Sequence, residues 1–89
     1  MTLQELREEI EGVDLEIIRL IRARMNISLK IAEEKSAAGL PTRDSLRAEM
    51  VLSGVASQAE RLDMDPLPVR EIFEILIQMS EDLQDRLRG

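Results

Sequence analysis

The apolar residues in the first part of the chain recur at alternating steps of three and four positions. Residues 3–35 read LQELREEIEGVDLEIIRLIRARMNISLKIAEEK. This spacing is a heptad seam and predicts one long amphipathic helix. Thr2 and Glu5 have the spacing of a capping box at its start, and Gly39 suits its C-terminal end. The seam positions are Leu3, Leu6, Ile10, Val13, Ile17, Leu20, Ile27 and Ile31.

Two shorter helices are predicted after the first, so the fold class is all-α. Either Thr42 or Asp44 is suited to cap the second helix. Asp65 followed by proline is a start signal for the third. The three helices are expected at about residues 3–37, 44–61 and 66–87. The apolar positions are Leu46, Met50, Val51, Val55 and Ala59 in the second helix and Val69, Phe73, Leu76, Leu83 and Leu87 in the third.

The length of the first helix leads to an expectation about assembly. A helix over residues 3–35 is roughly 50 Å long at 1.5 Å per residue. The rest of an 89-residue chain is too small to cover such a helix within a compact monomer. We therefore expect a single domain over residues 1–89 that forms an oligomer, in which a second copy buries the seam.

Composition narrows the class of protein. The formal net charge is −6, which argues against nucleic acid as a partner. The sequence has no cysteine and no histidine, so it offers no disulfide and no thiolate or imidazole metal ligand, and no all-oxygen metal cluster is evident. No apolar run is long enough to span a membrane, and the first residues do not resemble a secretory signal. We expect a soluble cytoplasmic protein without a membrane partner.

Several polar residues stand at positions where the seams require apolar ones. Arg24 interrupts the seam of the first helix, and Lys35 follows close to three full turns later, on the same side. A cation on an apolar face is costly unless an anion meets it. Together with neutral hydrogen-bond donors, these cations describe a pocket for an anion with several oxygens. The set comprises Arg24, Ser28, Lys35, Arg47, Ser80 and Gln84.

The same set limits the chemistry of the pocket. No nucleophile matched with a base is evident, so the pocket would bind, orient and stabilise charge rather than attack covalently. Arg7 lies about 25 Å before Arg24 along the helix, too far for one small ligand to contact both. If two first helices pack antiparallel, Arg7 of one chain approaches the Arg24 and Lys35 end of the other. The site would then be shared.

Each of these residues also has an ordinary structural explanation when it is considered alone. Arg24 can set the helix register or extend to the surface, and Lys35 can be solvated near the helix end. Ser80 can bond its own helix backbone, and Gln84 can be a surface residue. The other arginines can pair with neighbouring carboxylates. It is the coincidence of all of them in one pattern that favours the pocket.

In their order and spacing, these residues resemble the all-helical (AroQ-class) chorismate mutases over essentially the whole chain. The resemblance implies an intertwined homodimer of three-helix chains whose long first helices pair. It also implies the rearrangement of chorismate to prephenate, a step toward phenylalanine and tyrosine, without a cofactor or metal. The matching motifs are L-R-E-x-I-x-x-x-D at residues 6–14, Arg24 within IRARM, Lys35, P-T-R-D-S-L-R at residues 41–47, Asp65, and FEILIQMSEDLQ at residues 73–84.

The resemblance further implies a role for each position of the site. Arg24 would grip a substrate carboxylate, and Arg7 of the second chain would contribute to the carboxylate side of the same pocket. Lys35 would bond the ether oxygen and a carboxylate, and Gln84 would meet the ether oxygen from the other side. The positions near the substrate hydroxyl and carboxylates would be Asp44, Arg47 and Ser80.

One position departs from the family pattern. A glutamate that accepts a hydrogen bond from the substrate hydroxyl commonly follows the Arg47 position, whereas this chain has Ala48 and then Glu49. Since one residue turns a helix by 100°, Glu49 is not an obvious substitute. Either the loss weakens binding or slows turnover, or Glu49 or backbone groups near Asp44 hold the hydroxyl.

Two other functions stay open on the sequence alone. Isochorismate-pyruvate lyases have a similar fold and pocket and act on a sister substrate, although the R-D-S-L-R stretch favours the mutase slightly. A non-catalytic helical dimer that binds a partner or a small anion is the alternative from a different class. The missing glutamate is its main support.

Overall fold

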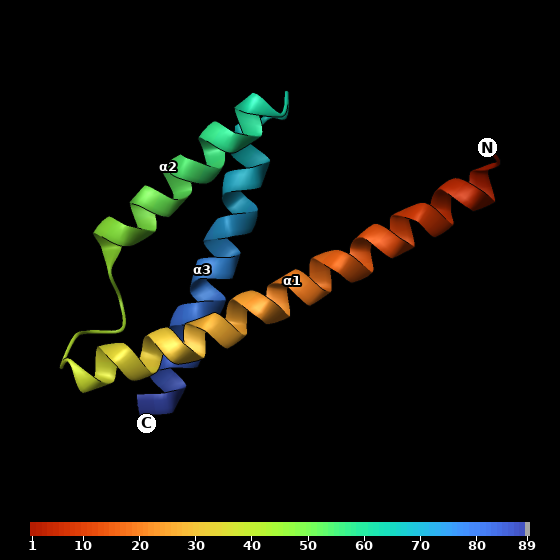
Figure 1. Cartoon of the computed structure of the whole chain (residues 1–89). Coiled ribbons are helices and arrows are strands. Elements are labelled where there is room, and N and C mark those ends of the chain that lie inside the picture. The colour runs from red at the N-terminus through yellow and green to blue at the C-terminus, as the bar shows by residue number, and fades with distance from the viewer. Residues whose placement is uncertain (89) are drawn as a thin grey trace.

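The computed structural model describes residues 1–88, which fold into three helices and no strand (Figure 1). α1 spans Leu3–Ala37, α2 spans Ser45–Arg61 and α3 spans Pro66–Arg88. The predicted all-α class is confirmed, and each predicted boundary agrees within one residue. Within residues 1–88, none of the helices has the length and apolar character needed to cross a membrane.

The ends of α1 follow the capping chemistry expected from the sequence. The Thr2 hydroxyl accepts a hydrogen bond from the Glu5 backbone N–H at 3.1 Å, and the Glu5 carboxylate accepts one from the Thr2 N–H at 3.4 Å. The helix ends at Ala37 with Ala38 as its C-cap, and Gly39 then adopts a φ of 70°. This left-handed conformation is open to glycine at little cost, so Gly39 turns the chain out of the helix.

Aspartates start both shorter helices. Asp44 Oδ1 accepts from the Arg47 N–H at 3.0 Å, and Asp65 Oδ1 accepts from the Leu67 N–H at 3.0 Å. Each carboxylate therefore satisfies a backbone donor that has no partner within its own helix and places negative charge at the positive end of the helix dipole. Of the two caps considered for the second helix, Asp44 is the one used.

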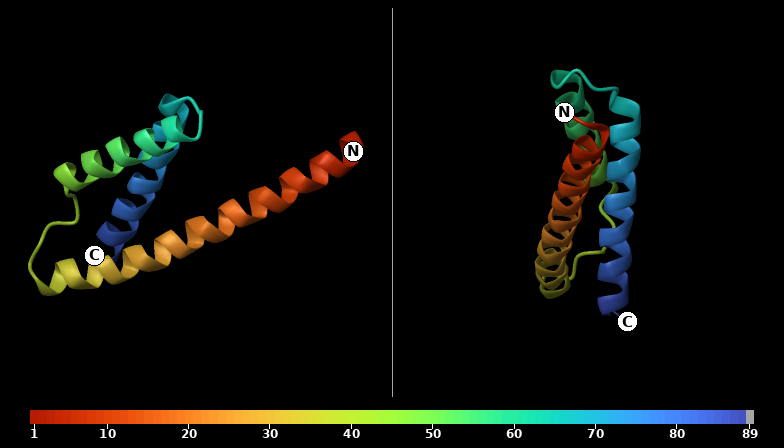
Figure 2. Two further views of the ribbon diagram at one scale, coloured as in Figure 1. Left: turned by 45° about the horizontal axis from the view of Figure 1, so that its top comes forward. Right: turned by 90° about the vertical axis from the view of Figure 1, so that its right-hand side faces the viewer.

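α2 and α3 form a helical hairpin that packs across the C-terminal half of the long helix α1. α2 and α3 run antiparallel, and α3 packs against both α2 and the C-terminal half of α1 (Figures 1 and 2). The N-terminal half of α1 projects away from this junction, which gives the chain extents of 55 × 24 × 14 Å (Figure 2). The site described below lies where α3 crosses α1.

Little apolar surface is buried within the chain. The buried apolar residues among residues 1–88 are Ala32, Leu52 and Ala59. Every residue of α1 as far as Leu20 is exposed, including Ile10 and Leu20 of the seam at 61% and 66%. A monomeric protein rarely shows a continuous apolar surface of this length to water. The seam on the projecting half of α1 therefore has no cover from its own chain.

The packed face of α2 differs from the one that its apolar positions suggested. Leu46 and Met50 are exposed at 82% and 64%, whereas Leu52, a position outside the expected set, is buried. Leu52 and Ala59 are seven residues apart and share the face toward α3, with Val55 half-buried between them. That face follows the spacing of three and four, and Leu46 lies on the opposite side of the helix.

Leu52→Ala is expected to lower the free energy of unfolding by about 2–4 kcal/mol, because it removes buried apolar surface and leaves a cavity. Leu46→Ala makes the same chemical change on the exposed side of α2 and is expected to cost less than about 0.5 kcal/mol. Urea unfolding followed by circular dichroism measures both values. Equal losses in the two variants would contradict the assignment of the buried face.

Candidate active site

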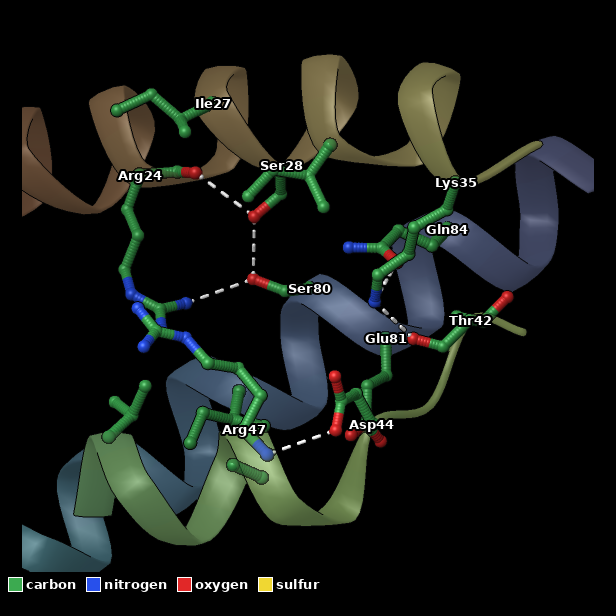
Figure 3. Close-up of a pocket in the computed structure, with 14 residues that line it drawn as sticks. Arg24, Ile27, Ser28, Lys35, Thr42, Asp44, Arg47, Ser80, Glu81 and Gln84 are labelled. Atoms are coloured by element: carbon green, nitrogen blue, oxygen red, sulfur yellow. Dashed lines mark hydrogen bonds between the residues drawn. The ribbon is translucent and has the colours of Figure 1, made fainter. Parts of the chain in front are cut away.

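A pocket of about 370 Å³ opens between the C-terminal half of α1, the start of α2 and the second half of α3 (Figure 3). This volume is in the range of small-molecule sites. Its apolar walls come from Ile27, Ile31, Ala48, Val51 and Ile77. Its polar side chains are Arg24, Ser28, Lys35, Thr42, Asp44, Arg47, Ser80, Glu81 and Gln84.

A closed chain of hydrogen bonds fixes Arg24 at one end of the pocket. Arg24 Nη1 donates to Ser80 Oγ at 2.9 Å and to the Leu76 carbonyl at 3.2 Å. Ser28 Oγ donates to the Arg24 carbonyl at 3.1 Å and lies 2.8 Å from Ser80 Oγ. Because the single hydroxyl proton of Ser28 is used on the carbonyl, Ser80 donates to Ser28. The remaining guanidinium N–H groups are available to an anion.

Lys35 and Gln84 meet at the other end of the pocket. Lys35 Nζ donates to the Thr42 carbonyl at 2.7 Å and lies 3.5 Å from Gln84 Oε1. Gln84 is buried, Lys35 is half-buried, and the amide nitrogen of Gln84 points into the pocket (Figure 3). Lys35 keeps a third N–H, so this end presents an ammonium and an amide donor to the same space.

The start of α2 closes the third side. The side chains of Arg47 and Arg24 are directed to the same end of the pocket (Figure 3), and within residues 1–88 neither makes an ion pair with a carboxylate. Two neighbouring guanidinium groups without a carboxylate partner form a site for an oxyanion, which both groups can bind through paired N–H donors. Asp44 stands at the edge of this side and caps the helix that carries Arg47.

The structure brings most of the expected site residues together. Six residues drawn from all three helices line this one pocket, and Asp44 joins them. The six are Arg24, Ser28, Lys35, Arg47, Ser80 and Gln84. Arg7 does not line the pocket, because it lies on the projecting half of α1. The roles of these side chains toward a substrate stay predictions at this point.

Two polar residues of the pocket were not expected from the sequence. The Thr42 carbonyl positions Lys35, but backbone acceptors leave no signal in a pattern of side chains. Glu81 follows Ser80 directly and does not interrupt the apolar seam, so it was not singled out from the other glutamates of the helix. Its position three residues before Gln84 was the available signal, since residues three apart share a helix face.

Glu49, one of the candidates to replace the family glutamate, does not line this pocket. Both of its carboxylate oxygens accept from Arg70 Nη2 at 3.1 Å, which ties α2 to α3. Arg70 also contacts Glu74 at 3.5 Å. The 100° turn between Ala48 and Glu49 thus points Glu49 at a structural partner instead of at the pocket.

Comparison with known protein families identifies the family of this chain. A family model described as chorismate mutase type II matches residues 6–85. This match covers nearly all of the three helices and every pocket residue, and the chain belongs to the chorismate mutase type II family.

Individual relatives carry related names. The chain is 29% identical over 82 residues to a chorismate mutase of Methanocaldococcus jannaschii, covering 92% of this chain and 83% of that protein. It is 27% identical over 75 residues to a 4-amino-4-deoxychorismate mutase of Streptomyces venezuelae, covering 84% and 73%. It is also 27% identical over 85 residues to a bifunctional chorismate mutase/prephenate dehydratase of Buchnera aphidicola, covering 96% of this chain but 22% of that protein.

Glu49→Gln is expected to lower the free energy of unfolding by less than about 1 kcal/mol, because the pair with Arg70 is partly exposed, at 61% for Glu49 and 32% for Arg70, and water screens it. A double-mutant cycle with Arg70→Gln, measured by urea unfolding, isolates the pair. A coupling energy of several kcal/mol would show that the ion pair is much less solvated than the structure indicates.

Proposed function

We propose that this pocket binds chorismate and rearranges it to prephenate, the reaction that supplies phenylalanine and tyrosine biosynthesis. The observation that carries the proposal is a pocket with three cationic side chains and no nucleophile–base pair. Chorismate is a dianion, and its rearrangement is unimolecular: one C–O bond breaks while one C–C bond forms. Such a reaction needs a folded substrate and a stabilised transition state, and it needs no acid, base or covalent intermediate.

The positions of the cations support control of the substrate conformation. Arg24 and Arg47 stand at one end of the pocket and Lys35 at the other. Chorismate has one carboxylate on its ring and one on its enolpyruvyl arm. Cations that bind both carboxylates therefore hold the arm over the ring. Ser80 keeps Arg24 in place for its carboxylate. Holding the two reacting carbons close removes much of the entropic part of the barrier.

Lys35 and Gln84, at the other end of the pocket, support stabilisation of the charge that develops in the transition state. Negative charge develops on the ether oxygen as the C–O bond breaks. Lys35 and Gln84 supply an N⁺–H and an amide N–H to one space, and the Thr42 carbonyl fixes the ammonium. Donors that are already oriented toward developing charge lower the transition state more than the ground state.

The exposed seam of α1 supports a homodimer in which the first helices pack antiparallel. This packing would bury Ile10, Leu20 and their neighbours and bring Arg7 of each chain to the pocket of the other. Arg7 would then add a third guanidinium for the substrate carboxylates. The intertwined dimer, the contribution of Arg7 and a cytoplasmic location stay predictions.

The purified protein is expected to convert chorismate to prephenate, with loss of the chorismate absorbance and prephenate identified by chromatography. The same assay with isochorismate tests the neighbouring activity. Salicylate and pyruvate from isochorismate alone would move the protein to the lyase branch. No turnover of either compound would favour a helical dimer that only binds.

Lys35→Ala is expected to lower kcat on chorismate about 100- to 1,000-fold, because it removes a donor aimed at the developing charge. Lys30→Ala removes an exposed lysine from the same helix and serves as the matched control. Circular dichroism and size-exclusion chromatography check that both variants keep their helices and assembly. Unchanged turnover in a folded Lys35→Ala variant would contradict the role of this ammonium.

Mixing two inactive variants tests whether the sites are shared. Arg7→Ala and Lys35→Ala chains, unfolded together and refolded, are expected to recover about a quarter of wild-type activity. Half of the dimers are then mixed, and one of the two sites in each mixed dimer has both side chains intact. Refolding each variant alone is the control. Failure to recover activity while mixed dimers form would rule out donation of Arg7 across the interface.

A further inference from the structure

We propose that Glu81 is a substrate-binding residue whose carboxylate accepts a hydrogen bond from the ring hydroxyl of chorismate. This inference rests on the proposed function and deepens it, because it assigns the part of the pocket that recognises the one hydrogen-bond donor of the substrate. It also identifies what takes the place of a glutamate at Ala48.

Glu81 lies in the pocket without a structural partner among residues 1–88. It is half-buried, it lies between Ser80 and Gln84 along α3, and it lines the same cavity. Its side chain extends from α3 toward Asp44 and the start of α2 (Figure 3). Within residues 1–88, the Glu81 carboxylate takes part in no ion pair and no side-chain hydrogen bond.

The chemistry of the ligand determines what this carboxylate can contact. A chorismate dianion has a single hydrogen-bond donor, the ring hydroxyl, and all its other oxygens are acceptors. A pocket carboxylate that faces the ligand can therefore bond only that hydroxyl, and it repels the other oxygens of the ligand. Glu81 and the guanidinium groups approach from different helices, so a bound dianion turns its carboxylates to Arg24 and Arg47 and its hydroxyl to Glu81.

Asp44 and the Thr42 carbonyl each already accept one hydrogen bond, whereas neither oxygen of the Glu81 carboxylate has a partner among residues 1–88. Asp44 Oδ1 caps α2 through the Arg47 N–H, and the Thr42 carbonyl accepts from Lys35. Ala48 lines the same pocket as Glu81 but carries only a methyl group. A carboxylate on α3 therefore reaches space that the small side chain on α2 leaves open. A charged acceptor also forms a stronger hydrogen bond with a hydroxyl than a neutral one does.

The test compares two substrates in two proteins. Chorismate and an analogue with hydrogen in place of the ring hydroxyl are assayed with wild type and with Glu81→Ala. The variant is expected to lose about 10- to 100-fold in kcat/KM on chorismate and to stay within about twofold or gain on the analogue, because only chorismate has the hydrogen bond to lose and the analogue is freed from repulsion by the carboxylate. Glu81→Gln, which keeps the size and a weaker acceptor, is expected to lose less and again only on chorismate.

Glu49→Gln is the matched control, since it removes a glutamate charge outside the pocket and is expected to leave both substrates within about twofold. Equal losses on both substrates, or no loss on chorismate in folded Glu81 variants, would overturn the assignment. If the wild type binds chorismate without converting it, the catalytic proposal fails alone, and the same comparison is made on Kd by calorimetry. Absence of binding in the wild type would overturn both.

Discussion

The junction between α1 and α3 is built largely from polar side chains, and the arrangement of the whole chain depends on it. The buried residues of α1 are Ser28 and Ala32, and those of α3 are Ser80 and Gln84. α3 also packs on α2, so the same junction sets the start of α2 opposite Lys35. Hydroxyl and amide groups gain less net free energy from burial than apolar ones do. Three of these junction residues, Ser28, Ser80 and Gln84, also line the pocket.

Most of the helical framework could be predicted from the sequence because its signals are local. Thr2, Asp44 and Asp65 each cap a helix through a backbone N–H two or three residues away, and such contacts depend on spacing alone. The packed face of α2 was predicted less well. Leu46 and Leu52 are equally apolar, and only the position of α3 decides which of them is buried. Packing between helices is tertiary information that a propensity does not contain.

The residues of the site also divide into those that the sequence pattern reveals and those that only the packing of the helices reveals. Arg24 and Ser80 were detectable because they break an apolar seam, and the cost of burying them is visible in the sequence. Glu81 does not interrupt the seam, and its spacing from Gln84 is a weaker signal than an interruption, so it was identified only from the packing of α3. Glu49 shows the opposite case: it lies beside the departure at Ala48 in sequence, but the helix turns it toward Arg70. Distance along the chain is therefore a poor guide to which carboxylate replaces another.

The hydrogen bonds around Arg24 also bear on the entropy of binding. They run from the guanidinium through Ser80 and Ser28 back to the Arg24 carbonyl, so each hydroxyl has a single favourable rotamer before any ligand arrives. The permanent positive charge of arginine fixes the direction of the whole ring. A ligand that docks on the outer face of this guanidinium immobilises few additional torsions there. Its binding free energy is then reduced less by reorganisation, which is the advantage of a preorganised receptor.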